Sequence, residues 1–263
     1  MKKRNITKLA LAALIALAFT SCVPDIDLAG HAWTSNTYCF DGGERVDTEF
    51  ALVCTSTNSG TLFISQTYAG EDMGICFAMP FTYTWDDNQG TATATLEFPE
   101  DLKGRKSMSK GTYTFKINMY YTKTEGMVVT SSDIERVLEI PCTSMALTKN
   151  DFAKPSAMTG TRWSVEFDEA IDAPDDMSMT AHYRYELEFV STTAAVLNLN
   201  YTEDGGDAEN MNWNVNYTYA DGVGLTSISF YGETVKGGFY MPDDTHMTFT
   251  DGENRLNLVK QSK

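Results

Sequence analysis

Residues 183–202 read YRYELEFVSTTAAVLNLNYT, and this stretch decides the fold. Apolar side chains at Tyr183, Tyr185, Leu187 and Phe189 alternate with charged ones. A period of two is typical of a strand with one buried and one solvent-exposed face. A Ser-Thr-Thr turn then leads into a second alternating run that ends at residue 202. The stretch therefore predicts two antiparallel strands joined by a short turn.

The same alternation recurs along most of the chain, for example at residues 62–67 and 113–118. Short turn signals separate the alternating runs, at residues 58–60, 87–90, 204–206, 221–222 and 251–252. This spacing fits antiparallel meanders and leaves no room for the crossover helices of a parallel sheet.

The two halves of the sequence resemble each other. Trp33 opens the first half and Trp163 opens the second. The other matches pair residues 56–64 with 191–199, 81–85 with 215–219, and 145–149 with 256–260. We interpret this as two copies of one domain, residues 31–149 and 159–260, joined by a linker at 150–158. A single large sandwich with accidental similarity is the alternative.

Eight strands are expected in the second copy, at about residues 163–167, 183–190, 194–202, 211–219, 223–231, 236–241, 245–250 and 254–260. Eight short antiparallel strands can close a sheet and so remove its exposed edges. A barrel of this size is filled by side chains or holds one small ligand. The fold class expected is all-β, with two tandem antiparallel meander barrels of about eight strands each; two β-sandwich domains are the alternative.

The N-terminus has the features of an export signal. Positive residues at positions 2, 3, 4 and 8 precede an apolar run at 9–19, followed by Thr20-Ser21-Cys22. This pattern is a secretory signal, and its apolar run is too short to span a bilayer. It resembles a bacterial lipoprotein signal, which implies removal of residues 1–21, lipid on Cys22 and a tether at 22–30.

Acidic residues follow the lipidated position, at Asp25 and Asp27. They resemble the surface-export signal of Bacteroidota lipoproteins. The resemblance implies attachment to the outer membrane through the lipid, with the protein facing the cell surface rather than the periplasm.

Composition excludes several classes of partner. The formal net charge is −16, and removal of the signal makes the chain more acidic still. This charge argues against nucleic acid, because such binding depends on Lys and Arg neutralising phosphates. No close Cys-x-x-Cys pair is present, and the acidic stretch at 203–209 lacks the spacing of a calcium loop. We expect no metal and no cofactor.

Catalytic patterns are absent from the sequence. His31, His182 and His246 lie outside any Gly-x-Ser-x-Gly or His-Glu-x-x-His setting. Glu186 and Glu188 fall on the solvent face of their strand, opposite the apolar residues. We expect that the protein is not an enzyme, and a hydrolase ranks third among the function classes.

A family resemblance covers nearly the whole mature chain. It is carried by the early Trp of each copy, the meander, and the Gly-aromatic hairpin followed by Leu256-x-Leu258-x-Lys260. These features resemble the lipocalin-like lipoproteins of Bacteroidota. The lipocalin Gly-x-Trp pattern is only approximate, as Gly-His-Ala-Trp at 30–33 and Gly-Thr-Arg-Trp at 160–163. The resemblance implies calycin-type barrels.

Aromatic residues on corresponding strands are the candidate ligand-binding residues: Tyr83, Trp85, Trp213, Tyr217 and Tyr219. They could floor an apolar cup, stack on sugar rings, or simply pack the core. The function expected is a lipid-anchored envelope protein that captures a small apolar ligand or a glycan. The alternative is a structural or protein-interaction surface lipoprotein, such as a glycan-binding or fimbria-associated sandwich, with an unspecified partner.

The cysteines predict one disulfide. Cys39 ends the first expected strand and Cys142 precedes the last, so both fall on one rim of a closed barrel. Closure makes those strands neighbours, within reach of a disulfide. We predict a Cys39–Cys142 bond with Cys54 reduced, and Cys76 is the competing partner.

Overall fold

The computed structural model describes residues 28–41, 43–68, 71–86, 91–98, 111–122, 126–130, 144–172, 178–203, 206–230, 232–252 and 254–262. Every regular element in these ranges is a β-strand. Within the same ranges, no helix has the length and apolar character needed to cross a membrane.

The first eight strands form a closed antiparallel barrel in simple sequence order. They are β1 (Ala32–Asp41), β2 (Glu44–Cys54), β3 (Ser59–Tyr68), β4 (Glu71–Asp86), β5 (Thr91–Phe98), β6 (Gly111–Thr122), β7 (Gly126–Thr130) and β8 (Ser144–Asn150). Pairing of β1 with β8, at Trp33 and Lys149 among others, closes the barrel.

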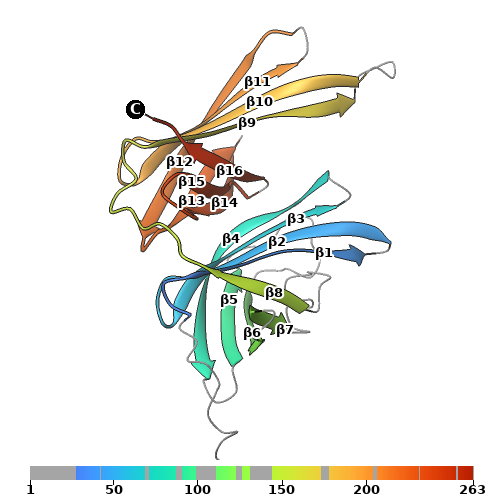
Figure 1. Cartoon of the computed structure of the whole chain (residues 1–263). Helices are drawn as coiled ribbons and strands as arrows, with labels where there is room; N and C mark the ends of the chain where they lie inside the picture. Colours follow the sequence, from blue (N-terminus) through green and yellow to red (C-terminus); the bar gives the residue numbers. More distant parts are fainter. Residues whose placement is uncertain are drawn as a thin grey trace, which may run out of the picture.

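The second eight strands form a second closed antiparallel barrel (Figure 1). They are β9 (Arg162–Asp172), β10 (Ser178–Phe189), β11 (Ala194–Glu203), β12 (Glu209–Ala220), β13 (Val223–Phe230), β14 (Glu233–Tyr240), β15 (His246–Thr250) and β16 (Arg255–Lys260). Pairing of β16 with β9, at Lys260 and Trp163, closes this barrel in the same way. The predicted pair of eight-stranded meander barrels is confirmed.

The turn between β12 and β13 shows how local sequence sets the register. Asp221 and Gly222 both have positive φ, 52° and 88°, as a two-residue type I′ hairpin requires. A Cβ on Gly222 would also lie 2.6 Å from the Phe152 ring. The Asp-Gly pair therefore fixes the hairpin and permits close contact with the linker.

Each barrel has a core built from the inward positions of its strands. The first core contains Trp33, Phe50, Leu52, Cys54, Leu62, Ile64, Phe77, Met79, Phe81, Tyr83, Ala94, Leu96, Met145 and Leu147. The second contains Trp163, Leu187, Phe189, Ala195, Leu197, Val215, Tyr217, Ile228, Phe239, Met241, Met247, Phe249, Leu256 and Leu258. Burial of these apolar side chains is the main force that holds each barrel closed.

Equivalent contacts recur in both barrels at one end. Lys149 Nζ lies 5.6 Å from the centroid of a Trp33 ring, and Lys260 Nζ lies 5.5 Å from that of Trp163. The hydroxyl of Tyr83 donates to the Ser56 carbonyl, and that of Tyr217 donates to the Ser191 carbonyl. The repeat seen in the sequence is therefore also a repeat of specific contacts. We name the end of each barrel at which these contacts lie the closed end.

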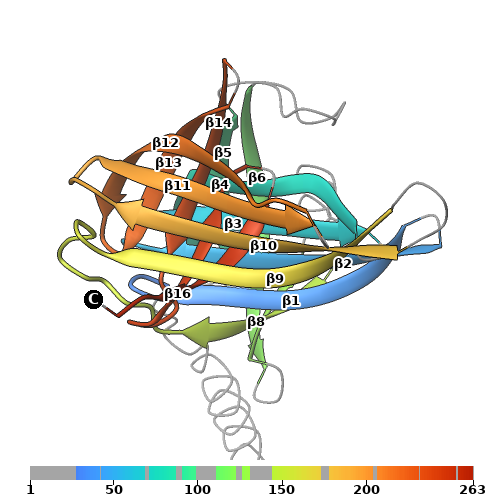
Figure 2. The ribbon, with the colours of Figure 1, turned by 90° about the horizontal axis from the view of Figure 1, so that it is seen from above.

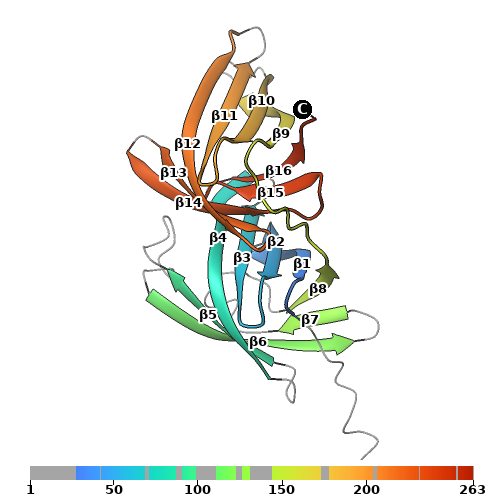
Figure 3. The ribbon, with the colours of Figure 1, turned by 90° about the vertical axis from the view of Figure 1, so that its left-hand side faces the viewer.

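The barrels also pack against each other. A third cluster of buried apolar residues, which we name the interface cluster, joins the outer faces of β1–β4 to those of β13 and β14 and includes one linker residue, Phe152. Its members are Ala32, Ala51, Val53, Phe63, Ala78, Phe152, Val223 and Tyr240. Arg255 at the start of β16 pairs with Glu49 on β2. Figure 3 shows β13 and β14 directly above β3 and β4, and Figure 2 shows β9 following nearly the same direction as β1.

The linker is held by both barrels. Phe152 belongs to the interface cluster, Ala153 forms a β-bridge with Met241, and Met158 is buried in the second core. Lys154 Nζ donates to the Gly30 carbonyl, 3.3 Å away. These contacts fix the connection on the surface of the molecule.

The cysteines lie as follows. Cys39 is disulfide-bonded, whereas Cys54 and Cys76 are buried thiols. Burial raises the pKa of the Cys54 thiol to about 12. Cys22 and Cys142 lie outside the described residues, so the Cys39–Cys142 bond stays a prediction. Cys76, which lies inside β4, is not disulfide-bonded, so it is not the competing partner of Cys39.

Candidate ligand site at the mouth of the second barrel

Strands β9, β10 and β11 and the start of β12 extend well beyond β13–β16 (Figure 1). Strand β9 continues to Asp172, whereas the sequence indicated a strand only to about residue 167. Glu169 pairs with Ala181 and Asp172 pairs with Ser178, so the ladder with β10 holds the extension in place. We call this projecting end the mouth.

A row of aromatic rings crosses the inner face of the mouth. Tyr183 on β10 lies directly opposite Phe167 on one side and Tyr201 on the other. Ring centroids are 5.3 Å apart for Phe167 and Tyr183, and 5.0 Å apart for Tyr183 and Tyr201. We name Phe167, Tyr183 and Tyr201 the aromatic row. Tyr185, one step deeper, stacks on Phe167 with a centroid distance of 6.1 Å.

The aromatic row is open to solvent. Phe167 is 39% exposed, and Tyr183 and Tyr201 are only partly buried. A large apolar side chain left in water gives up the free energy that burial would supply. Exposed aromatic rings gathered in one place are therefore a feature that marks binding surfaces.

The first barrel has a different row at the same place. Four residues beyond Trp33 lies Thr37, which pairs with Thr48, which in turn pairs with Gln66. Thr48 and Gln66 are 0% exposed, and Gln66 Nε2 donates to Thr48 Oγ1 over 3.3 Å. One copy thus has a polar row with buried members where the other has partly exposed rings. This difference between two otherwise similar barrels makes the mouth of the second barrel the candidate ligand site.

Carboxylates surround the aromatic row. Burial and the negative charges of Glu169 and Glu203 raise the pKa of Tyr183. Burial and the charge of Asp251 raise the pKa of Tyr185 to about 12. The hydroxyl of Tyr201 donates to Glu203, and this bond raises the pKa of Tyr201 to about 12. The mouth therefore combines apolar rings with a negative potential.

The outer face of the same strands contains arginines that pair with glutamates. Arg162 Nη2 lies 2.9 Å from Glu188 Oε1, and the Arg184 guanidinium lies near Glu166 and Glu186. Glu186 and Glu188 are thus on the solvent face, as the alternation predicted. These surface ion pairs contribute little to stability. On the inner face, by contrast, carboxylates lie beside the aromatic rings.

Two of the predicted ligand residues, Tyr83 and Tyr217, are core residues at the closed ends. They are 4% exposed, and their hydroxyls donate to the carbonyls of Ser56 and Ser191 over 2.6 and 2.7 Å. Their rings pack against Phe81 and Phe189 respectively. Their geometry is that of structural residues.

The other three predicted residues also face inward. Tyr219 stacks on Phe239 at 6.0 Å and donates its hydroxyl to the Pro155 carbonyl. Trp85 packs against the first core. Trp213 contacts Phe230, with centroids 5.0 Å apart, and lies two inward positions deeper along the barrel than the aromatic row. Of the five, the structure brings only Trp213 near the mouth.

Sequence reasoning missed Phe167, Tyr201 and the surrounding carboxylates. The alternation at Tyr183 and Tyr185 was visible, but one strand does not reveal what lies opposite it on its neighbours. Only the register of β9, β10 and β11 aligns the three rings.

A separate groove of about 420 Å³ lies between the closed ends of the two barrels. Hydroxyl-bearing residues of β3, β4 and β5, including Ser59, Thr61 and Thr82, line one side. Residues of β12 and β13, including Thr218 and Leu225, line the other. Neither Trp213 nor Tyr217 lines this groove, so it is distinct from the predicted site.

The three histidines each contact an aspartate. His31 bonds Asp151 and His182 bonds Asp168, both through Nδ1. His246 uses the same nitrogen, Nδ1, for Asp243 and for its neighbour Thr245. In the described ranges, no group of three or more His, Cys, Asp or Glu side chains could hold a metal ion.

The class defined by these observations is a tandem antiparallel β-barrel protein whose second barrel has an open aromatic mouth. No protein-family model matches the chain, and no curated protein was found to be similar.

Proposed function

We propose that this chain is a non-catalytic binding protein of the bacterial cell envelope, which captures a small molecule at the mouth of its second barrel. The ligand presents an apolar face, either that of a small apolar compound or that of a sugar ring. The observation that carries this proposal is the partly exposed aromatic row, which replaces a polar row in the first barrel.

The proposal includes a lipid anchor on Cys22 that holds the protein at the outer membrane, facing the cell surface. Its support is the N-terminal sequence alone, since these residues lie outside the described ranges. Replacement Cys22→Ala should move the protein from the membrane fraction to the soluble fraction. Unchanged partitioning of this variant would refute the anchor.

Uptake of a neutral apolar fluorophore, N-phenyl-1-naphthylamine, tests the proposed site. The repeat supplies a matched variant, F167T/Y183T/Y201Q, which installs the residues of the first barrel's polar row. We name it the row-exchange variant. Wild-type protein should show saturable fluorescence enhancement at one site, and the row-exchange variant should lose it while keeping its β-sheet circular dichroism. Equal uptake by both proteins would place the apolar site elsewhere.

The second candidate function is a protein-interaction lipoprotein. The observation in its favour is that both barrels have large buried cores, in which the Tyr83 and Tyr217 hydroxyls already have partners. Under this alternative, wild-type protein takes up no fluorophore at all.

A further inference from the structure

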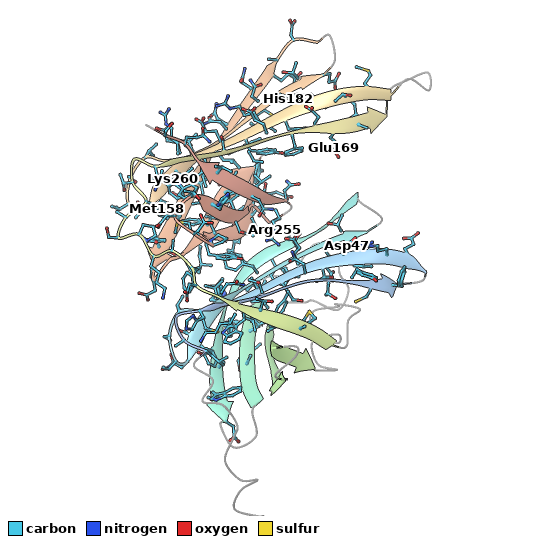
Figure 4. All side chains as sticks on the ribbon, viewed as in Figure 1. Asp47, Met158, Glu169, His182, Arg255 and Lys260 are labelled. Carbon is cyan, nitrogen blue, oxygen red and sulfur yellow. The ribbon has the colours of Figure 1, made fainter. Side chains whose placement is uncertain are left out.

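The charge at the mouth of the second barrel identifies the class of ligand, given the proposed function on which this step depends. Glu169 on β9, Glu203 on β11 and Glu209 on β12 occupy inward positions beside the aromatic row. Figure 4 labels Glu169 on the projecting part of β9. Glu233 begins β14 opposite the inward residue Phe230, and Asp251 follows β15.

In the described ranges, the inward positions around the mouth carry acidic residues but no basic ones. Beyond the Trp163 level and into the mouth, the described inward positions of β9–β16 hold four carboxylates and no Lys, Arg or His, and Asp251 in the turn after β15 is a fifth carboxylate. Arg162 and Arg184 belong to the outer face, where glutamates neutralise them. Arg255 pairs with Glu49 of the first barrel, and it lies between the barrels in Figure 4.

The carboxylates act on the same rings that form the site. Glu169 and Glu203 both influence the Tyr183 hydroxyl, and Asp251 and Glu169 influence that of Tyr185. Asp251 is buried and accepts hydrogen bonds from the backbone and side chain of Asn254, so its position is fixed. The negative charge is therefore built into the frame of the mouth.

Rings surrounded by carboxylates disfavour an anionic ligand such as a fatty acid, because like charges repel at short range in a partly desolvated site. The same arrangement favours a cation, since aromatic faces attract ammonium groups and the carboxylates add their own attraction. We propose that the mouth binds an organic cation, a small amine or quaternary ammonium compound whose methyl or methylene groups pack on Phe167, Tyr183 and Tyr201.

Two probes of the same shape test this inference. Choline carries a quaternary ammonium, and 3,3-dimethylbutan-1-ol carries the same branched group with carbon in place of nitrogen. Calorimetric titration of the full chain should show choline binding at least about fivefold tighter than the neutral alcohol. The double variant E169Q/E203Q should weaken choline binding and leave the alcohol unchanged.

Further variants locate the effect. The row-exchange variant should lose both probes, whereas Phe40→Leu, at an exposed ring on the outside of β1, should keep both. Equal affinity for the two probes overturns the charge inference and leaves the proposed function standing. The same holds if neither probe binds while N-phenyl-1-naphthylamine does. If none of the three compounds binds, both the inference and the proposed function are wrong.

Discussion

The ring of Phe63, on the outer face of β3, packs against the ring of Tyr240, on the outer face of β14, with centroids 4.9 Å apart. These side chains belong to different barrels, and both are almost completely buried. The contact lies in the apolar cluster that joins the two barrels. We expect burial of this cluster to couple the unfolding of the two barrels.

Phe63→Ala should therefore weaken the contact between the barrels. We expect a loss of about 3 kcal/mol in the free energy of unfolding, the usual cost of removing a buried ring. Calorimetry should show one transition for the wild type and an earlier or divided transition for the variant. Phe40→Ala, at a ring that is 66% exposed, is the control and should change stability by less than about 0.5 kcal/mol. A variant as stable as the wild type would show that the barrels fold independently.

The ion pair between Glu49 and Arg255 gives a second prediction. Burial lowers the pKa of Arg255 to about 10. Arg255→Met should destabilise by about 1–2 kcal/mol, because it leaves a carboxylate without its partner; Glu49 is 38% exposed, so solvent reduces the cost. Denaturant unfolding of R255M, E49Q and the double variant measures this. The double variant should recover part of the loss, and strictly additive effects would rule out the coupling.

Gly224 and Phe239 give a third prediction, on packing inside the second barrel. The two residues are opposite each other in β13 and β14, and a Cβ on Gly224 would lie 2.1 Å from the Phe239 ring. Gly224→Ala should therefore cost about 1–3 kcal/mol through overpacking. Gly206→Ala, at an exposed turn where the nearest atom is 3.4 Å away, should be close to neutral. Similar thermal midpoints for the two variants would contradict this packing.

Cys54 should be chemically inert in the folded protein. Its thiol is buried and its pKa is raised to about 12, so almost no thiolate exists at pH 8. Iodoacetamide should leave Cys54 unmodified in native protein and alkylate it after unfolding, as peptide mapping would show. Because the folded pKa lies above the unfolded one, this thiol's stabilising effect is complete below an ordinary thiol pKa and is lost as pH rises toward 12. Rapid native-state alkylation would disprove the burial.

Sequence periodicity predicted the strands because one face of each strand contacts the core. The alternation around Leu187 and Leu197 placed β10 and β11 correctly to within a few residues, except at the start of β10. It failed for the end of β9, because acidic residues between positions 168 and 176 suggested a loop, whereas the strand continues to Asp172. Pairing with β10 keeps that segment extended, as in the contact between Asp168 and His182. The conformation of this segment is therefore set by its pairing with β10, which local composition does not reveal.

One feature of the sequence does indicate the interface between the barrels. Residues 50–54 read FALVC, an uninterrupted apolar run inside an otherwise alternating pattern. Such a run is typical of a strand that is buried on both faces. Ala51 and Val53 do point outward into the interface cluster, whereas Phe50 and Leu52 point into the first core. The partner of this surface could not be predicted, because it depends on how the two copies pack.

The measurement that tests the central claim most directly is native mass spectrometry of the protein purified from the cells that naturally produce it. Wild-type protein should retain a small molecule, and the row-exchange variant, prepared identically, should carry none while keeping its fold. Such a result would assign the bound compound to Phe167, Tyr183 and Tyr201. Equal occupancy in the two proteins, or no bound compound in the wild type, would contradict the assignment of the second barrel's mouth as a binding site.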